Sequence, residues 1–107
     1  MKIGILGGTF NPIHLGHLIL ADEVREKLQL DRILFVPAYL PPHKKRTGIA
    51  RAADRLAMVK LAIKDNGSFA VSDVGIKRKG RSYTIDTLQA LKRLYARDDL
   101  YFITGSD

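Results

Sequence analysis

The chain has 107 residues, with 18 Lys and Arg against 11 Asp and Glu, three His and no Cys, so its net charge is +7. This length holds at most one domain, and 46% hydrophobic with 27% charged residues is typical of a soluble globular protein rather than a disordered chain. The absence of Cys excludes disulfides, thiolate catalysis and Cys-bound zinc. No apolar run approaches the roughly 20 residues of a membrane span, and the short glycine-rich start is not a signal peptide, so we expect a cytoplasmic protein.

The hydrophobic pattern predicts a strand, a helix and a second strand in the first third of the chain. The first strand runs from Lys2 to Gly8, and a loop over residues 9–13 leads into an amphipathic helix. A second buried strand follows at residues 32–37, and the breaker-rich segment 38–48 predicts a loop. The apolar face of the helix is expected to carry Leu18, Ala21, Val24 and Leu28.

The rest of the chain repeats this alternation. A helix over residues 50–64 and a short strand over 69–73 precede a glycine- and charge-rich stretch, 74–82, which is predicted as a loop. A third helix is expected over 85–96 with Thr84 as its N-cap, and a fourth strand over 100–104. The two helices are expected to bury Leu56, Val59 and Ile63, and Ile85, Leu88, Leu91, Leu94 and Tyr95.

This βαβαβαβ order predicts an α/β fold in which helices cover both faces of a parallel sheet. Ligands of such sheets bind beyond the carboxyl ends of the strands, and the unusual residue clusters of this chain lie there. These ends are residues 7–9, 37–38, 73–74 and 105–107. The excess of positive charge indicates an anionic partner, either nucleic acid or small phosphates.

Residues 7–17 read Gly-Gly-Thr-Phe-Asn-Pro-Ile-His-Leu-Gly-His. Two glycines after a strand let the backbone turn sharply, and the helix N-terminus that follows favours phosphate. His14 and His17 would share one helix face, with Gly16 leaving room for a ligand. The segment is neither a P-loop nor a dinucleotide fingerprint, and the histidines lack a suitably spaced third ligand, so we predict no metal site.

Residues 8–17 resemble the signature of the nucleotidyltransferase superfamily, whose core is H/T-x-G-H. Within it, Pro41-Pro42-His43-Lys44 and the segment 82–88 resemble bacterial nicotinate-nucleotide adenylyltransferases, and residues 102–107 resemble their G-x-D segment. The resemblance implies a Rossmann-like nucleotidyltransferase fold. It also implies adenylyl transfer from ATP to nicotinate mononucleotide, which yields nicotinate adenine dinucleotide and pyrophosphate in NAD biosynthesis.

The resemblance further implies roles for individual residues. They are the catalytic His14, His17 and Lys44, the nucleotide-binding Gly8, Thr9, Phe10, Gly16, Gly105 and Asp107, and the substrate-binding Asn11 and Thr84. The attacking phosphate monoester has a second pKa of about 6, so the reaction needs positioning and positive charge rather than a general base. Mg²⁺ would arrive on the ATP phosphates rather than in a protein cage.

Two alternatives remain open at this stage. One is another adenylyltransferase of the superfamily, with nicotinamide mononucleotide or phosphopantetheine as acceptor. The other is a non-catalytic basic fragment that binds nucleotides or nucleic acid. The basic residues 77–81 lack interleaved aromatics and predict a solvated loop, so we expect neither a specific nucleic acid nor a membrane as partner.

The resemblance carries one expectation about the extent of the domain. Members of the family are considerably longer, so residues 1–107 are expected to form a single domain that is incomplete at its C-terminus. Substrate binding would then be weakened, and an exposed apolar sheet edge would favour self-association.

Overall fold

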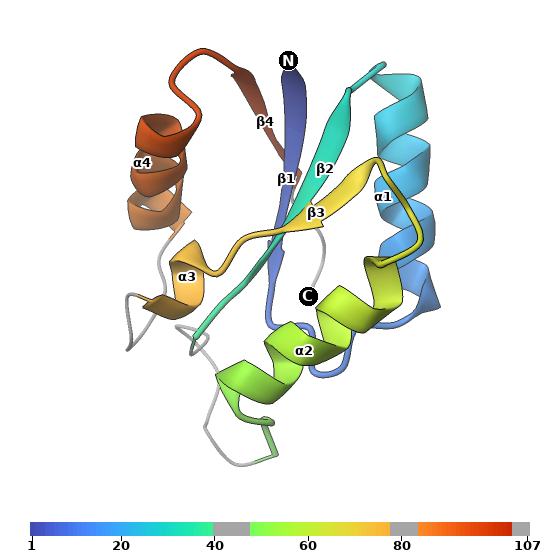
Figure 1. Cartoon of the computed structure of the whole chain (residues 1–107), viewed down its shortest axis with the longest axis vertical. Coiled ribbons are helices and arrows are strands. Elements are labelled where there is room, and N and C mark those ends of the chain that lie inside the picture. The colour runs from blue at the N-terminus through green and yellow to red at the C-terminus, as the bar shows by residue number, and fades with distance from the viewer. Residues whose placement is uncertain (40–47, 78–83, 104–107) are drawn as a thin grey trace.

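The computed structural model describes residues 1–39, 48–77 and 84–103 (Figure 1). Within them, four strands form one parallel sheet of order β3-β2-β1-β4. The strands are β1 (Lys2–Gly8), β2 (Arg32–Pro37), β3 (Phe69–Val71) and β4 (Asp99–Ile103). The helices are α1 (Leu15–Lys27), α2 (Ala52–Ile63), α3 (Val74–Lys77) and α4 (Thr84–Leu94).

Strand β1 lies in the interior of the sheet and sets the register of its neighbours. It pairs with β2 from Ile3 opposite Arg32 to Gly8 opposite Pro37, and with β4 on its other side. The strand order therefore reverses at β1, and parallel sheets bind ligands at such a switch point. Because Gly8 and Pro37 are register partners, the loops after β1 and β2 begin side by side. The Ala38 N–H confirms this by donating to the Gly8 carbonyl at 2.9 Å.

Alternating side chains of the strands enter two separate cores, one on each face of the sheet. Figure 1 shows α1 and α2 against one face and α3 and α4 against the other. The first core includes Leu6, Ala21, Ile33, Phe35, Val59 and Ile63. The second includes Ile3, Ile5, Leu34, Val36 and Leu91. The predicted three-layer α/β architecture is therefore confirmed, because near-continuous apolar strands are buried on both faces.

The predicted loop over residues 74–82 is wrong at its start, because Val74–Lys77 forms the short helix α3. The N–H groups of Ile76 and Lys77 both donate to the Asp73 carbonyl at 2.9 Å. A Cβ at Gly75 would stand 2.7 Å from the Pro37 carbonyl oxygen, so glycine lets α3 approach the end of β2. Four residues are too few to produce a helical period in the sequence, which is why the pattern missed this turn.

Some of the expected apolar stripes are also wrong at their ends. Leu28, Ile85 and Leu94 are 50%, 63% and 66% exposed, because each lies at or beyond a helix end. The helical contact with the core is made by the middle of each stripe, as by Leu91 of α4. Helix α4 also includes Thr84, so this residue is not the N-cap that we expected, and its side chain lies outside the described part.

Candidate functional site

Helix α1 begins with two histidines that cap it reciprocally. His14 is the N-cap, and its Nδ1 accepts a hydrogen bond from the Gly16 N–H at 3.1 Å. In return, Nδ1 of His17 accepts from the His14 N–H, also at 3.1 Å. The ring centroids are 3.9 Å apart with the planes inclined by 31°. The sequence prediction that these histidines come together is confirmed, and the cap is the reason.

This cap also sets the tautomer of each neutral imidazole. A ring nitrogen that accepts a hydrogen bond carries no proton, so the geometry assigns the N–H of both neutral rings to Nε2. Two N–H donors thus stand at the positive end of the helix macrodipole. Such an arrangement suits anionic oxygen atoms and needs no protonation of either ring.

The His14 ring occupies the space that a side chain at position 16 would need. A Cβ at this position would lie 2.9 Å from Cε1 and 3.0 Å from Nδ1 of His14. The room that we expected Gly16 to leave for a ligand is therefore used by the imidazole, and a direct contact of Gly16 with a nucleotide remains a prediction.

The turn before the histidines is made at Phe10. The sharp turn predicted at the glycines is wrong, because Gly7 and Gly8 both belong to β1 and the left-handed backbone is at Phe10, with φ of 50°. This conformation costs a non-glycine residue on the order of 1–3 kcal/mol. The Phe10 ring is buried, and its centroid stands 5.1 Å from that of His17 in an edge-on arrangement. The left-handed backbone at Phe10 thus places the Phe10 ring against the ring of His17.

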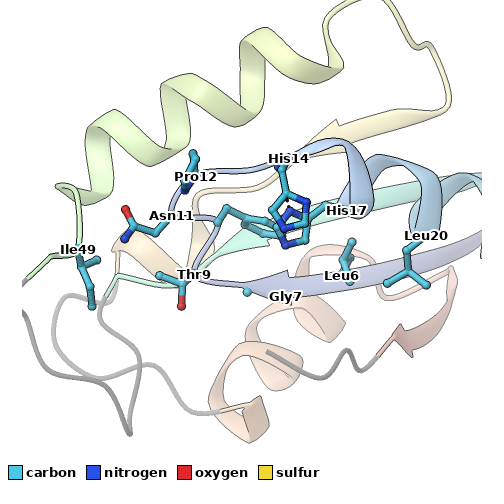
Figure 2. A pocket seen from close by; sticks show the side chains of 11 residues that line it. Leu6, Gly7, Thr9, Asn11, Pro12, His14, His17, Leu20 and Ile49 are labelled. Carbon is cyan, nitrogen blue, oxygen red and sulfur yellow. Dashed lines mark hydrogen bonds between the residues drawn. The ribbon is translucent and has the colours of Figure 1, made fainter.

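Six of the predicted site residues line one pocket, shown in Figure 2. They are Gly8, Thr9, Phe10, Asn11, His14 and His17. Its wall is completed by Gly7 and Pro12 of the same motif and by Leu6, Leu20 and Ile49, which the sequence had not indicated. The predicted residues Lys44, Gly105 and Asp107 lie outside the described residues, as does the side chain of Thr84.

Asn11 connects the pocket loop to the segment that precedes α2. Its Nδ2 donates to the Gly48 carbonyl at 2.8 Å, and its Oδ1 accepts from the Ala50 N–H at 3.0 Å. Both ends of the amide are therefore engaged with backbone. Binding of substrate by Asn11, implied by the resemblance, remains a prediction.

Arg55 of α2 is the functional candidate that sequence reasoning missed. Its side chain is 1% exposed and donates to the carbonyls of Thr9, Ala38, Tyr39 and Ala50 at 2.6–2.8 Å. Burial lowers the pKa of this guanidinium. An arginine in an amphipathic helix is normally assigned to solvent, and its one sequence signal is its spacing of four and eight residues from the buried Val59 and Ile63.

In the part of the chain that the structure describes, no group of three or more His, Asp or Glu side chains is placed to hold a metal ion. The helices of the same residues are all too short or too polar to span a bilayer.

Comparison with known proteins yields one family and one architecture. Residues 5–107 match the cytidylyltransferase-like family. The chain is 58% identical over all 107 residues to a probable nicotinate-nucleotide adenylyltransferase of Syntrophotalea carbinolica, and 55% identical to that of Geobacter sulfurreducens. It covers 49% and 50% of these proteins, so it spans about half the length of the curated relatives it matches.

A solved structure has the same fold. The nicotinic acid mononucleotide adenylyltransferase of Plasmodium falciparum, complexed with NaAD, aligns with 99% of this chain and 52% of its own. The TM-score is 0.81 at 23% sequence identity. This likeness supports the arrangement of strands and helices described above.

Proposed function

This chain belongs to the cytidylyltransferase-like family, and we propose that its protein transfers the adenylyl group of ATP to nicotinate mononucleotide. The observation that carries the proposal is the reciprocal cap of α1, which leaves Nε2 as the N–H nitrogen of two histidines at a helix N-terminus, where phosphate groups are favoured. The acceptor is proposed from the relatives that share 55–58% of these residues, whose names specify nicotinate nucleotide. The fold neighbour contains NaAD, the dinucleotide product of this reaction.

The proposed reaction needs no general base on the protein. A phosphate oxygen of nicotinate mononucleotide attacks the α-phosphorus of ATP. The bond from that phosphorus to the oxygen bridging to the β-phosphate breaks, and pyrophosphate leaves. The attacking phosphate is largely dianionic at neutral pH, because its second pKa is about 6. What the site must supply is alignment of two polyanions and stabilisation of the charge that moves to the leaving group.

His14 and His17 supply part of that stabilisation under this proposal. Each donates Nε2–H to an ATP phosphate oxygen while its Nδ1 stays bound to the helix backbone. The triphosphate enters as its magnesium complex, so the ion comes with the substrate. The remaining roles follow the family resemblance: Lys44 reaches the phosphates, Gly105 and Asp107 hold a ribose, and Thr84 binds the nicotinate side.

The test is turnover by the complete gene product with ATP and nicotinate mononucleotide, followed by chromatography of nicotinate adenine dinucleotide. Substitution His17→Ala removes one phosphate donor and is expected to lower kcat/KM about 100- to 1000-fold. Glu23→Ala, on the exposed side of the same helix, is the matched control and should leave the rate unchanged.

Two results would refute this assignment. A rate that His17→Ala does not alter would remove the catalytic role of the histidine. Turnover confined to phosphopantetheine or nicotinamide mononucleotide, assayed in parallel, would replace the proposed acceptor.

A further inference from the structure

We propose that Arg55 is a positioning residue of the nucleotide site: its buried guanidinium fixes the pocket loop against both flanks of residues 40–47. This inference rests on the proposed function, because it assigns Arg55 a part in that reaction. The four hydrogen bonds of Arg55 all go to backbone carbonyls, so Arg55 acts through the backbone that it holds.

The guanidinium uses all three of its nitrogens. Nε donates to the Ala50 carbonyl at 2.8 Å, and Nη2 donates to the Tyr39 carbonyl at 2.7 Å. Nη1 donates to two carbonyls, those of Thr9 at 2.8 Å and Ala38 at 2.6 Å. Because the group is planar and its donors diverge at set angles, four carbonyls are held in one arrangement. A lysine, with three donors on one atom, cannot reproduce this geometry.

These contacts join segments that are distant in sequence. Thr9 belongs to the loop that lines the pocket, 46 residues before Arg55. Ala38 and Tyr39 immediately follow β2, and Ala50 stands shortly before α2. The described residues on the two sides of 40–47 are therefore bound by one side chain. Asn11 adds a second link from the same pocket loop to Gly48 and Ala50.

The anchor is itself well supported. Arg55 rises from α2, where Val59 and Ile63 are buried in the core beneath the sheet. In the described residues Arg55 forms no ion pair, so its charge is balanced by carbonyl dipoles alone. Burying a cation in this way is costly, and an apolar side chain would avoid that cost but leave the four carbonyls without these donors. The geometry points to loop placement as the property that an apolar residue cannot supply.

The test compares Arg55→Lys and Arg55→Met with the control Arg51→Met in the complete gene product. Arg51 lies four residues earlier, its side chain is 84% exposed, and among the described residues it pairs with Asp54 at the surface, so its variant matches the change in charge and size. Two quantities are measured: amide hydrogen exchange by mass spectrometry, and steady-state kinetics with ATP and nicotinate mononucleotide.

The expected result has two parts. In Arg55→Lys, peptides covering residues 9–13 and 38–50 exchange at least 10-fold faster, whereas peptides of β1 and β2 keep their protection. In the same variant kcat/KM for ATP falls about 10- to 100-fold with a raised KM, because folded molecules hold the loop out of place. Arg55→Met shows a larger effect of the same kind, and Arg51→Met behaves as the unaltered protein.

Three outcomes would overturn the inference. Unchanged exchange in both loop peptides would show that Arg55 does not hold them. A loss of kcat at constant KM, as for a smaller folded fraction, would indicate a role in stability alone. Global loss of protection in Arg55→Lys would do the same. Failure of the proposed function looks different: the unaltered protein would lack turnover, while the exchange data would still show whether Arg55 holds the loops.

Discussion

Two imidazoles at the start of α1 serve the helix and the proposed reaction at once. Ser, Thr, Asn or Asp would satisfy the unpaired N–H groups of a helix start equally well. An imidazole differs because its second nitrogen stands on the far side of the ring. With Nδ1 of His14 and His17 bound to backbone N–H groups, Nε2 of each neutral ring carries the proton and is the donor nitrogen. This division of labour accounts for histidine at both positions.

The use of Nδ1 for the helix cap and Nε2 as a donor depends on the absence of a side chain at Gly16. Substitution Gly16→Ala places a Cβ 2.9 Å from the His14 ring, which must move and give up its hydrogen bond. We expect kcat/KM to fall at least about 10-fold, even though alanine favours helix over glycine by up to about 1 kcal/mol. Steady-state kinetics and urea denaturation measure the two effects. Gly67→Ala is the control, since its Cβ would meet no atom within 4 Å. Full activity of Gly16→Ala would contradict the cap.

At the scale of the elements, α1 ends as it begins, with backbone groups of its terminal turn satisfied by hydrogen bonds. The Leu30 N–H donates to the Arg25 carbonyl at 2.9 Å and the Gln29 N–H to the Glu26 carbonyl at 3.3 Å. These bonds form a Schellman motif, in which the residue at Gln29 must be left-handed, and its φ is 54°. The motif turns the buried Leu30 back against the core that contains α1. It also explains why Leu28, which precedes the turn, faces solvent.

Gln29 is thus the less favourable residue at a glycine position. Substitution Gln29→Gly is expected to stabilise the protein by about 0.5–1 kcal/mol, because it removes a left-handed strain of about 1–2 kcal/mol and adds unfolded-state entropy that offsets part of the gain. Lys27→Gly, inside the last turn of the same helix, should instead destabilise it by about 1 kcal/mol. Urea midpoints compare the two, and a Gln29→Gly variant no more stable than the unaltered chain would rule out the strain.

At the scale of the whole molecule, the amino terminus is joined to the start of the last described strand. The Met1 ammonium donates to Oδ1 of Asp98 at 2.8 Å, and the Asp99 N–H donates to the Met1 carbonyl at 2.9 Å. The hydrogen bond to Asp98, followed by the charge of that carboxylate, raises the pKa of the terminal amine above its ordinary 8.0. This contact joins residues 97 apart in the sequence, just before the point where the pairing of β1 with β4 begins.

The raised pKa predicts a pH dependence of stability. A group whose pKa is higher in the folded state contributes stability that is fully present below its unfolded pKa. That contribution is lost as the pH rises through the folded value. The unaltered protein should therefore exceed Asp98→Asn in urea midpoint at about pH 7, and the small difference should shrink towards about pH 10 and in high salt. Asp65→Asn, exposed after α2, is the control. A difference that stays constant with pH would contradict this account.

The sequence by itself determined most of the architecture, because the relevant signals are local. Apolar runs such as residues 32–37 predicted β2, and their alternation with helical periods predicted a parallel sheet with helices on both faces. The motif that ends in His14 and His17 located the pocket, since residues a few positions apart in a loop and the helix turn after it must come together. Both inferences depend on neighbours within one or two elements.

Only the tertiary structure decided what holds that pocket together. The role of Arg55 depends on its hydrogen bonds to carbonyls up to 46 residues away in the sequence. The role of the left-handed Phe10 depends on the contact of its ring with that of His17. Helix α3 depends on the space that Gly75 leaves beside Pro37, a contact between two elements. A period in the sequence reports which side of one element is buried. It does not report which distant backbone will stand opposite a particular side chain, because the packing of several elements determines that contact.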